Sequence, residues 1–350
     1  MSLFAGSSFN RRLFSGEQLI FALTGMLAPV AVIGLLIGPT PVTFSSIFYP
    51  EQHPLDWTII SEIRLPRLLL TAMIGSVLAT SGAVLQGLFR NPLADPSLIG
   101  VTAGASVGAS FSILIGASLI GSTFLGSALG GLTLTAAGAF LGGIVAVWMV
   151  YRLSTGPSGT SVSTMLLVGI AVTVFGGALN NLMSFVADNE MLRRMSLWQM
   201  GNLDLANWHR VQLCAVMMIF FVALLHNQAQ SLNILLLGES EARHLGIDVN
   251  LMKRKLILLT ALGVGVSTAL AGTIAFVGLI VPHVVRLLIG PDHRSLLPAS
   301  ALLGAILLVT ADTLARIVIN PAELPVGIIT AFLGVPFFLT LLVQQRRSHA

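Results

Sequence analysis

The sequence predicts an all-α, polytopic membrane protein with about ten transmembrane helices in a single domain over residues 1–350. Composition is the first reason, because 55% of the 350 residues are hydrophobic and only 9% are charged. The second is a mean hydropathy of +0.91, a value typical of membrane proteins and not of soluble domains. The third is the recurrence of apolar runs near the roughly 20 residues that one helix needs to cross a bilayer.

The apolar runs place ten spans along the chain, separated by short polar stretches. We expect them at residues 18–38, 64–88, 97–116, 127–151, 161–185, 207–226, 252–274, 275–290, 298–317 and 324–343. An even number of spans puts both termini on one side of the membrane. With the N-terminus inside, twelve of the eighteen lysines and arginines lie in cytoplasmic segments, so the positive-inside rule predicts N-in, C-in.

The segments between the spans have distinct characters. Residues 39–62 contain four prolines and are expected to be an irregular outer loop that does not span. The turn at residues 90–96 holds two prolines, which predict a rigid stop before the next helix. Residues 191–200, with Trp198 and Trp208 nearby, are expected to form an interfacial helix on the outer side.

The longest charge-dense stretch lies at residues 238–248 and is followed by Lys253, Arg254 and Lys255. Such a segment cannot remain in hydrocarbon, because each ion buried in lipid is costly. Its basic end predicts a cytoplasmic loop, over about residues 232–251, that contacts something soluble.

An enzyme reading has little support, and no catalytic residues are predicted. A P-loop needs a lysine after a glycine, but the two lysines, Lys253 and Lys255, do not follow glycine. The single cysteine, Cys214, argues against a disulfide framework and a cysteine-ligated metal site, and no metal site is predicted. The net charge of +4 is interpreted as a topology signal and not as a sign of nucleic-acid binding.

A few polar side chains stand inside or at the ends of the spans. Asp312 and Arg316 lie four residues apart, on one helix face, so they can pair. We favour this pairing over a proton relay through Asp312, because a relay usually needs more than one intramembrane carboxylate. Asn180 and Asn181 lie in the fifth span and either line a polar path or hold helices together.

Arg64 and Arg67 open the second span from the outer side, against the positive-inside bias. They either extend their charged groups to the lipid headgroups or form, with Arg316, a basic patch for an acidic partner.

Gly100, Gly104 and Gly108 lie in the third span at spacing four, which predicts a helix-packing face.

Several motifs in order resemble those of the permease subunits of type II ABC importers, the iron-siderophore, haem and cobalamin uptake family. They are Arg64-Leu65-Pro66-Arg67, residues 81–86 and 91–96, Leu237-Gly238-Glu239 with Ala242 and Leu245-Gly246, residues 278–283, Ala311-Asp312 with Ala315-Arg316, and residues 323–327. The resemblance covers nearly all of the chain from about residue 60 to the end.

The resemblance implies a homodimer with a substrate path at its axis, two ATP-binding cassette ATPase subunits below and a periplasmic binding protein above. ATP and Mg would be bound by the ATPase subunits, and no cofactor by this chain. It implies ATPase coupling at Gly238, Glu239, Ala242, Leu245 and Gly246, docking of the binding protein at Arg64, Arg67 and Arg316, and a pathway at Asn180, Asn181 and Ser184.

The similarity to haem-uptake members is greatest, so haem is the expected cargo, with ferric siderophore as the close alternative and cobalamin also within the family. Haem iron is normally held by His, Tyr, Met or Cys, and His53, His209 and Tyr49 lie on the expected outer side. A proton-coupled secondary transporter of a small solute is the alternative from another class. The expected location is the bacterial inner membrane.

Overall fold

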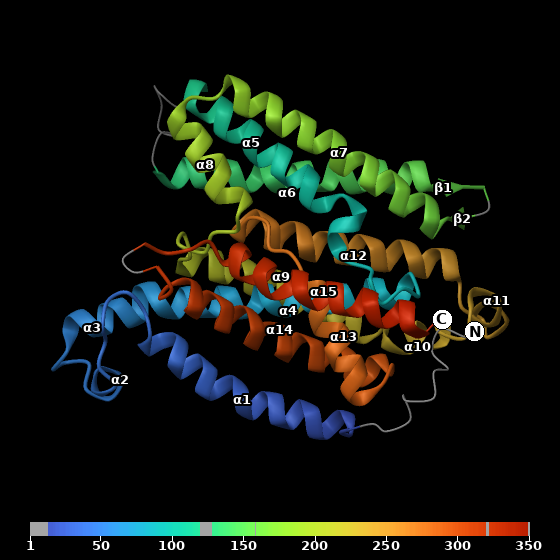
Figure 1. The fold of residues 1–350 in the computed structure, drawn as a ribbon, viewed down its shortest axis with the longest axis horizontal. Helices are drawn as coiled ribbons and strands as arrows, with labels where there is room; N and C mark the ends of the chain where they lie inside the picture. The colour runs from blue at the N-terminus through green and yellow to red at the C-terminus, as the bar shows by residue number, and fades with distance from the viewer. Residues whose placement is uncertain (1–12, 120–127, 158, 320–321, 349–350) are drawn as a thin grey trace.

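A computed structural model of the chain describes residues 13–119, 128–157, 159–319 and 322–348. The described part is almost wholly helical, and its strands are the short antiparallel pair β1 (Thr155–Gly156) and β2 (Gly159–Thr160). The long helices lie side by side along one direction (Figure 1). One end of this bundle carries α2, α3 and α8 and is called the α3 end; the opposite end carries α11 and is called the α11 end.

Among the described residues, ten helices of 13 to 27 residues overlap the ten predicted spans. They are α1 (Gly16–Leu36), α4 (Leu65–Leu88), α5 (Val101–Leu119), α6 (Ala128–Ser154), α7 (Val162–Val186), α9 (Trp208–His226), α12 (Val249–Ala271), α13 (Val277–Ile289), α14 (His293–Ala315) and α15 (Val326–Ser348). Shorter elements are α2 (Ser45–Phe48), α3 (Pro54–Thr58), the π-helix η1 (Ile59–Arg64), the 3-10 helix η2 (Pro96–Ile99), α8 (Asn189–Gln199), α10 (Ala229–Leu235) and α11 (Glu239–His244).

Among the described residues, seven helices are long and apolar enough to cross a membrane, and the apolar parts of α5, α13 and α15 are shorter. The first described helix, α1, begins at the α11 end, and α15 finishes there (Figure 1). This arrangement is the one that an even number of spans requires. The count of ten spans and the N-in, C-in orientation remain predictions.

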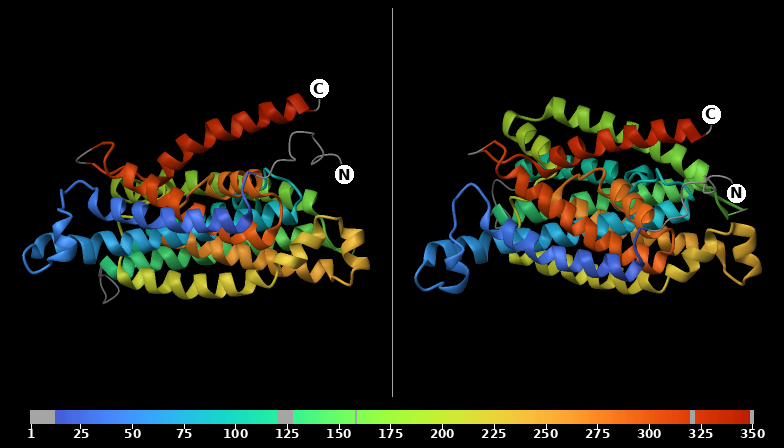
Figure 2. Two further views of the ribbon diagram at one scale, coloured as in Figure 1. Left: turned by 90° about the horizontal axis from the view of Figure 1, so that it is seen from below. Right: turned by 60° about the horizontal axis from the view of Figure 1, so that its bottom comes forward.

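Helix α4 lies at the centre of the bundle and packs against α14, α13, α12 and α9. Nearly all of its residues are buried, including both faces of its middle turns. Helices α5, α6 and α7 form a second group that meets the first mainly through α12 (Figure 1). Helix α15 projects away from the body of the protein (Figure 2, left).

Glycines bring the helix backbones together at the centre. A Cβ atom on Gly75 would collide with the carbonyl oxygen of Gly304 in α14, and one on Gly82 with that of Gly278 in α13. The predicted packing face on α5 is confirmed for Gly104 and Gly108, which face glycines of α6. Small residues give this close approach because no side chain separates the backbones.

The predicted irregular loop over residues 39–62 is wrong at its second half. Helix α3, the π-helix η1 and α4 form one apolar helix from Pro54 to Leu88. Pro54 stands in the first turn, where the missing backbone N–H removes no hydrogen bond and the fixed φ favours the helix. The proline that we interpreted as a sign of a loop is therefore the start of the longest helix described.

Candidate functional site

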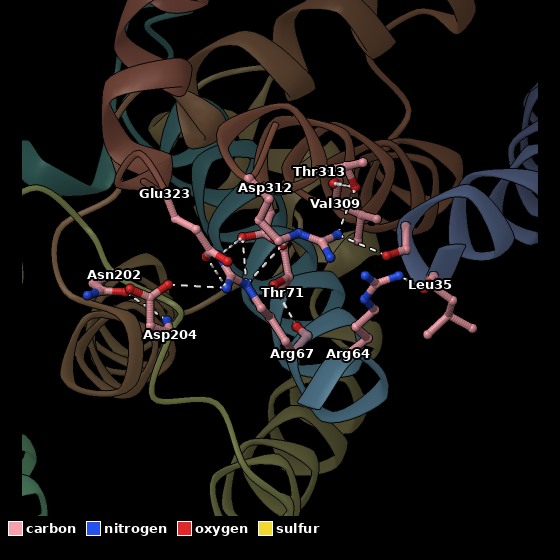
Figure 3. Close-up of polar contacts among 12 residues, drawn as sticks. Leu35, Arg64, Arg67, Thr71, Asn202, Asp204, Val309, Asp312, Thr313 and Glu323 are labelled. Atoms are coloured by element: carbon pink, nitrogen blue, oxygen red, sulfur yellow. Dashed lines mark hydrogen bonds and ion pairs between the residues drawn. The ribbon is translucent and has the colours of Figure 1, made fainter. Parts of the chain in front are cut away.

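A network of buried ion pairs joins α4 to α14 near the α3 end (Figure 3). The guanidinium of Arg67 donates from Nη2 and Nε to Asp312 Oδ1, at 2.8 and 3.0 Å. Its Nη1 lies 2.6 Å from Glu323 Oε2 and 3.1 Å from Asp204 Oδ1. Asp312 also approaches Arg316, with 3.2 Å between Oδ2 and Nε. One arginine therefore binds α14 and the loops that follow α8 and α14.

The network pairs charged side chains that are buried away from water. Arg67, Arg316 and Asp312 are 8%, 4% and 2% exposed, and such charges are stable only when they are paired and hydrogen-bonded. The predicted pairing of Asp312 with Arg316 is confirmed. The contact with Arg67 was not predicted, because no local spacing relates residues so far apart in sequence.

Arg64 serves a separate purpose one turn before Arg67. Its Nη1 donates to the carbonyl oxygens of Leu35 and Leu36, both at 2.7 Å, and its Nη2 donates to that of Thr40. The last carbonyls of a helix lack partners within the helix and attract cations. Arg64, which stands at the start of the neighbouring helix α4, therefore caps the C-terminal end of α1.

The three arginines predicted to receive carboxylates of a binding protein do gather at the α3 end. Their side chains point inward, however, and already hold this chain's own carboxylates and carbonyls (Figure 3). Docking through them remains a prediction, and it requires a partner's carboxylates to replace these internal ones. Asp204 is the most accessible competitor, because its side chain is 49% exposed.

The predicted coupling loop is largely helical at the α11 end. Gly238 and Gly246, with φ values of +125° and +85°, stand directly before and shortly after α11. Both conformations favour glycine, since a Cβ atom is strained there. Ala242, within α11, is fully buried, while Leu245, the residue after the helix, is 60% exposed. Glu239 Oε1 lies 2.6 Å from Nζ of the buried Lys253 and so ties α11 to the first turn of α12.

A pocket of about 370 Å³ lies between the two groups of helices. Its wall includes η2, α5, α7 and the non-helical residues 273–275 that separate α12 from α13. Pro96 and Gly278 meet at one edge of it: a Cβ atom on Gly278 would lie 2.9 Å from Pro96 Cδ. Non-helical backbone occurs inside a membrane protein where it is enclosed by protein or lines a cavity.

Two of the predicted pathway residues, Asn180 and Asn181, line this pocket, and Ser184 does not. Asn180 holds helices together, because its Oδ1 accepts from Ser110 at 2.7 Å and its Nδ2 donates to Ser106 at 3.1 Å. Asn181 is exposed and makes no hydrogen bond through its side chain within the described part of the chain. Asn180 therefore joins helices, as one of the two alternatives holds, and a pathway role for either asparagine remains a prediction.

Asp95 also lines the pocket and was not predicted as a site residue. It caps η2, accepting the backbone N–H of Ser97 at 2.9 Å. Burial raises the pKa of its carboxyl group, while the hydrogen bonds from Ser97 act in the opposite direction. The sequence signal was present in the turn at residues 90–96, but it was interpreted only as a structural turn.

The candidate haem ligands stand apart from the pocket. Tyr49 is 59% exposed, His209 is exposed, and Nε2 of His53 lies 3.3 Å from Oγ of Ser45. Among the described residues, no three His, Cys, Asp or Glu side chains gather in a group that could hold a metal ion. The predicted interfacial segment is the helix α8, whose position at a membrane surface remains a prediction.

Comparison with known proteins gives the same picture. The model of the FecCD transport family matches residues 26–344. The hemin transport system permease protein HmuU of Yersinia pestis is 39% identical over 325 residues, which are 93% of this chain and 95% of HmuU. The cobalamin import system permease protein BtuC of Halobacterium salinarum is 44% identical over 334 residues, 92% of this chain and 86% of BtuC.

A solved structure assigned to the metal-chelate type of ABC transporters, in an inward-facing conformation, is also similar. Its TM-score is 0.82 at 32% sequence identity, and the match covers 94% of this chain and 99% of the other. The helices and the charged α11 end define a multi-pass membrane subunit of a transport system. The chain belongs to the FecCD transport family, as a permease of the type II ABC importer group.

Permeases of this group are not catalytic; they work with separate ATPase subunits and with a substrate-binding protein. This assignment replaces the alternative of a proton-coupled secondary transporter. Asp312, the carboxylate that a relay would have used, is held between Arg67 and Arg316.

Proposed function

We propose that the chain is the permease of an importer that moves haem from a periplasmic binding protein to the cytoplasm of a bacterium. The similarity to HmuU over almost the whole of both chains carries this proposal. Cobalamin is the closest competing cargo, because BtuC proteins are similarly close. A ferric siderophore is the third, as another metal chelate.

In the proposed orientation, the α11 end faces the cytoplasm and the α3 end faces outward, across the inner membrane. The basic residues after α11 support this orientation through the positive-inside rule. Leu237 and Leu245, 65% and 60% exposed, stand on either side of α11 and offer apolar contacts to an ATPase subunit.

Movement of α11 would reach the pocket through α12. The ion pair of Glu239 with Lys253 fixes α11 to the start of α12, and Val264 in the same helix lines the pocket. Gly238 and Gly246 allow α11 to change direction, since their φ values favour glycine. ATP binding to the partner subunits would shift the balance between two packings of the helices.

The working unit would be a homodimer with two ATPase subunits. We assign its interface to α7 and the projecting α15, which expose large apolar side chains: Phe175 and Phe185 of α7 are 61% and 88% exposed, and Phe332 of α15 is 75% exposed. If these faces meet a second copy of the chain, the two pockets open toward a shared axis. Asn181 would then line the path.

The test is ATPase activity of the chain co-purified with its ATPase partner in lipid, with binding protein loaded with haem, cobalamin or a ferric siderophore. Stimulation by the haem-loaded protein alone is the expected result. Stimulation by another cargo would keep the importer and change its substrate. Absence of a co-purifying ATPase would contradict the proposal.

A further inference from the structure

Lys253, near the start of α12, is a buried lysine whose side chain contacts two other elements of the chain. That side chain is 5% exposed, and its Nζ atom lies 2.6 Å from Oε1 of Glu239 in α11. The same Nζ atom donates to the backbone carbonyl oxygen of Thr160 in β2, at 3.3 Å. One ammonium group therefore joins α11, α12 and the β1–β2 hairpin.

The hairpin belongs to the second group of helices, because it connects α6 to α7, and it lies at the α11 end (Figure 1). Its two sides are held together by the backbone hydrogen bond from Ser161 to Ser154, at 3.0 Å. The hydroxyl groups of Thr155 and Thr160 also meet at 3.0 Å. Ser161 directly follows Thr160 and caps α7, since its Oγ accepts the N–H of Thr164. A displacement of Thr160 is therefore passed to the start of α7.

A second contact holds the hairpin against α12. Gly159 has a φ of +104°, which favours glycine, and a Cβ atom there would lie only 2.5 Å from Oδ1 of Asn250. Asn250 stands three residues before Lys253, so the two residues lie on neighbouring positions of one helix face. The hairpin thus packs closely on the same part of α12 that carries the lysine.

The burial of Lys253 makes its contacts costly to break. A buried ammonium group is stable only when it is paired and hydrogen-bonded, and its partners within the described residues are Glu239 and Thr160. Separation from Glu239 would leave the charge inside the protein with one neutral carbonyl. The exposed contact of Glu239 with Arg243, at 3.9 Å, is cheaper to break because water can replace either partner.

The pocket lies between the two groups of helices, so its shape depends on how α7 and α12 move relative to each other. Val264 of α12 lines one part of its wall, and Thr173 and Asn181 of α7 line another. We propose that Lys253 is a positioning residue that makes the hairpin and α7 follow α11 when the ATPase subunits act. This inference rests on the proposed function and deepens it, because α12 alone would carry the movement to only one wall.

The first measurement is the distance between spin labels on α11 and on the hairpin, in the complex of the chain with its ATPase subunits in lipid. Glu241→Cys and Pro157→Cys provide the labelling sites, since both residues are exposed and the native Cys214 is buried. Unlabelled chain is mixed in, so that both labels of a pair lie in one chain. In the otherwise unchanged protein, the distance is expected to stay the same when ATP and vanadate are added, because Lys253 holds the two elements together.

Lys253→Met keeps an unbranched side chain and removes the charge, so ATP and vanadate are expected to change the label distance in this variant. The second measurement is uptake of haem per ATP hydrolysed, with haem-loaded binding protein outside the vesicles. Lys253→Met is expected to lower this ratio at least about tenfold, and Lys253→Arg, which keeps a cation, to restore most of it. Lys255→Met is the matched control, because Lys255 is exposed, and it should behave as the wild type does.

A label distance that nucleotide leaves unchanged in Lys253→Met would overturn the proposal, and so would a distance that changes equally with and without the lysine. If Lys253→Met does not fold, Glu239→Gln weakens the same ion pair from its partly exposed side and should also let the distance change. A constant distance in that variant would count against the proposal. Absence of haem uptake by the wild type would instead contradict the proposed cargo, and the label distances would still decide the role of Lys253.

Discussion

Arg67 and Asp312, 245 positions apart in the chain, meet through a forked contact in which Nε and Nη2 both donate to Oδ1. Both side chains are almost completely buried. We expect Arg67→Gln to lower the free energy of unfolding by about 3–5 kcal/mol, because removing one partner leaves the other charge buried and uncompensated. Thermal or denaturant unfolding in detergent measures this loss.

The control for that variant is Arg194→Gln. Arg194 pairs with Glu190 on the surface of α8, where both side chains are more than half exposed. Exposed pairs contribute little, so a change within about 0.5 kcal/mol is expected. Equal effects of the two substitutions would contradict the assignment of Arg67 as the centre of a buried network.

The docking hypothesis makes a prediction about Asp204. Because Asp204 competes for Nη1 of Arg67, Asp204→Asn should tighten binding of the substrate-binding protein if carboxylates of that protein contact Arg67. Arg67→Glu should weaken binding by charge repulsion. Affinity for the binding protein, measured on folded samples, distinguishes the outcomes, and an unchanged affinity in both variants would exclude Arg67 as a docking residue.

Coupling is tested at Glu239. Glu239→Arg replaces an attraction to buried Lys253 by repulsion, so it should abolish ATP-coupled uptake while leaving the binding protein able to dock at the other end. Glu241→Arg makes the same charge change in the same helix, at an exposed residue without an ion pair in the described part, and should have a smaller effect on uptake. Normal uptake by the Glu239 variant would contradict the assignment of Glu239 to ATPase coupling.

Substitutions of the two asparagines of α7 are expected to have different effects, on stability for Asn180 and on transport for Asn181. Asn180→Leu removes hydrogen bonds to Ser106 and Ser110 and is expected to cost about 1–2 kcal/mol of stability. Asn181→Leu removes none of them and should leave stability nearly unchanged while altering transport. Comparison of unfolding with uptake for both variants gives the answer, and a reversed order would contradict the assignment.

Helix packing at the centre is tested with glycines. Gly82→Ala is expected to destabilise the protein by about 1–3 kcal/mol, because its methyl group would collide with backbone of α13 that cannot move without repacking. Gly25→Ala is the control, since a Cβ atom there meets no atom within 4 Å and alanine favours a helix. If both alanines are tolerated equally, α4 and α13 are not in close backbone contact.

The sequence predicted what local order controls and missed what distant contacts control. Apolar runs predicted ten helices because each continuous apolar run forms one helix. The spacing of four residues predicted the pair of Asp312 and Arg316. The inward direction of Arg64 and Arg67 depends on α1 and α14, which no motif around those arginines reveals. The pocket at Asp95 depends likewise on five or more elements that meet only in the folded chain.

The helical segment before α4, formed by α3 and η1, was missed for another reason. Proline was taken as a mark of irregular structure, although its place in a first helical turn is an equally common signal. Pro54 followed by an apolar run fits the second interpretation.

The continuous helix from Pro54 to Leu88 contains 35 residues, which at 1.5 Å per residue span about 52 Å. The hydrocarbon core of a bilayer is only about 30 Å thick, so this helix is longer than the core, and in the proposed orientation its first turns would project beyond it. They form a stiff arm whose base is clamped by Arg67 and Asp312. A force applied near Trp57, at the free end of this arm, would therefore be transmitted along the helix to the buried contact of Arg67 with Asp312.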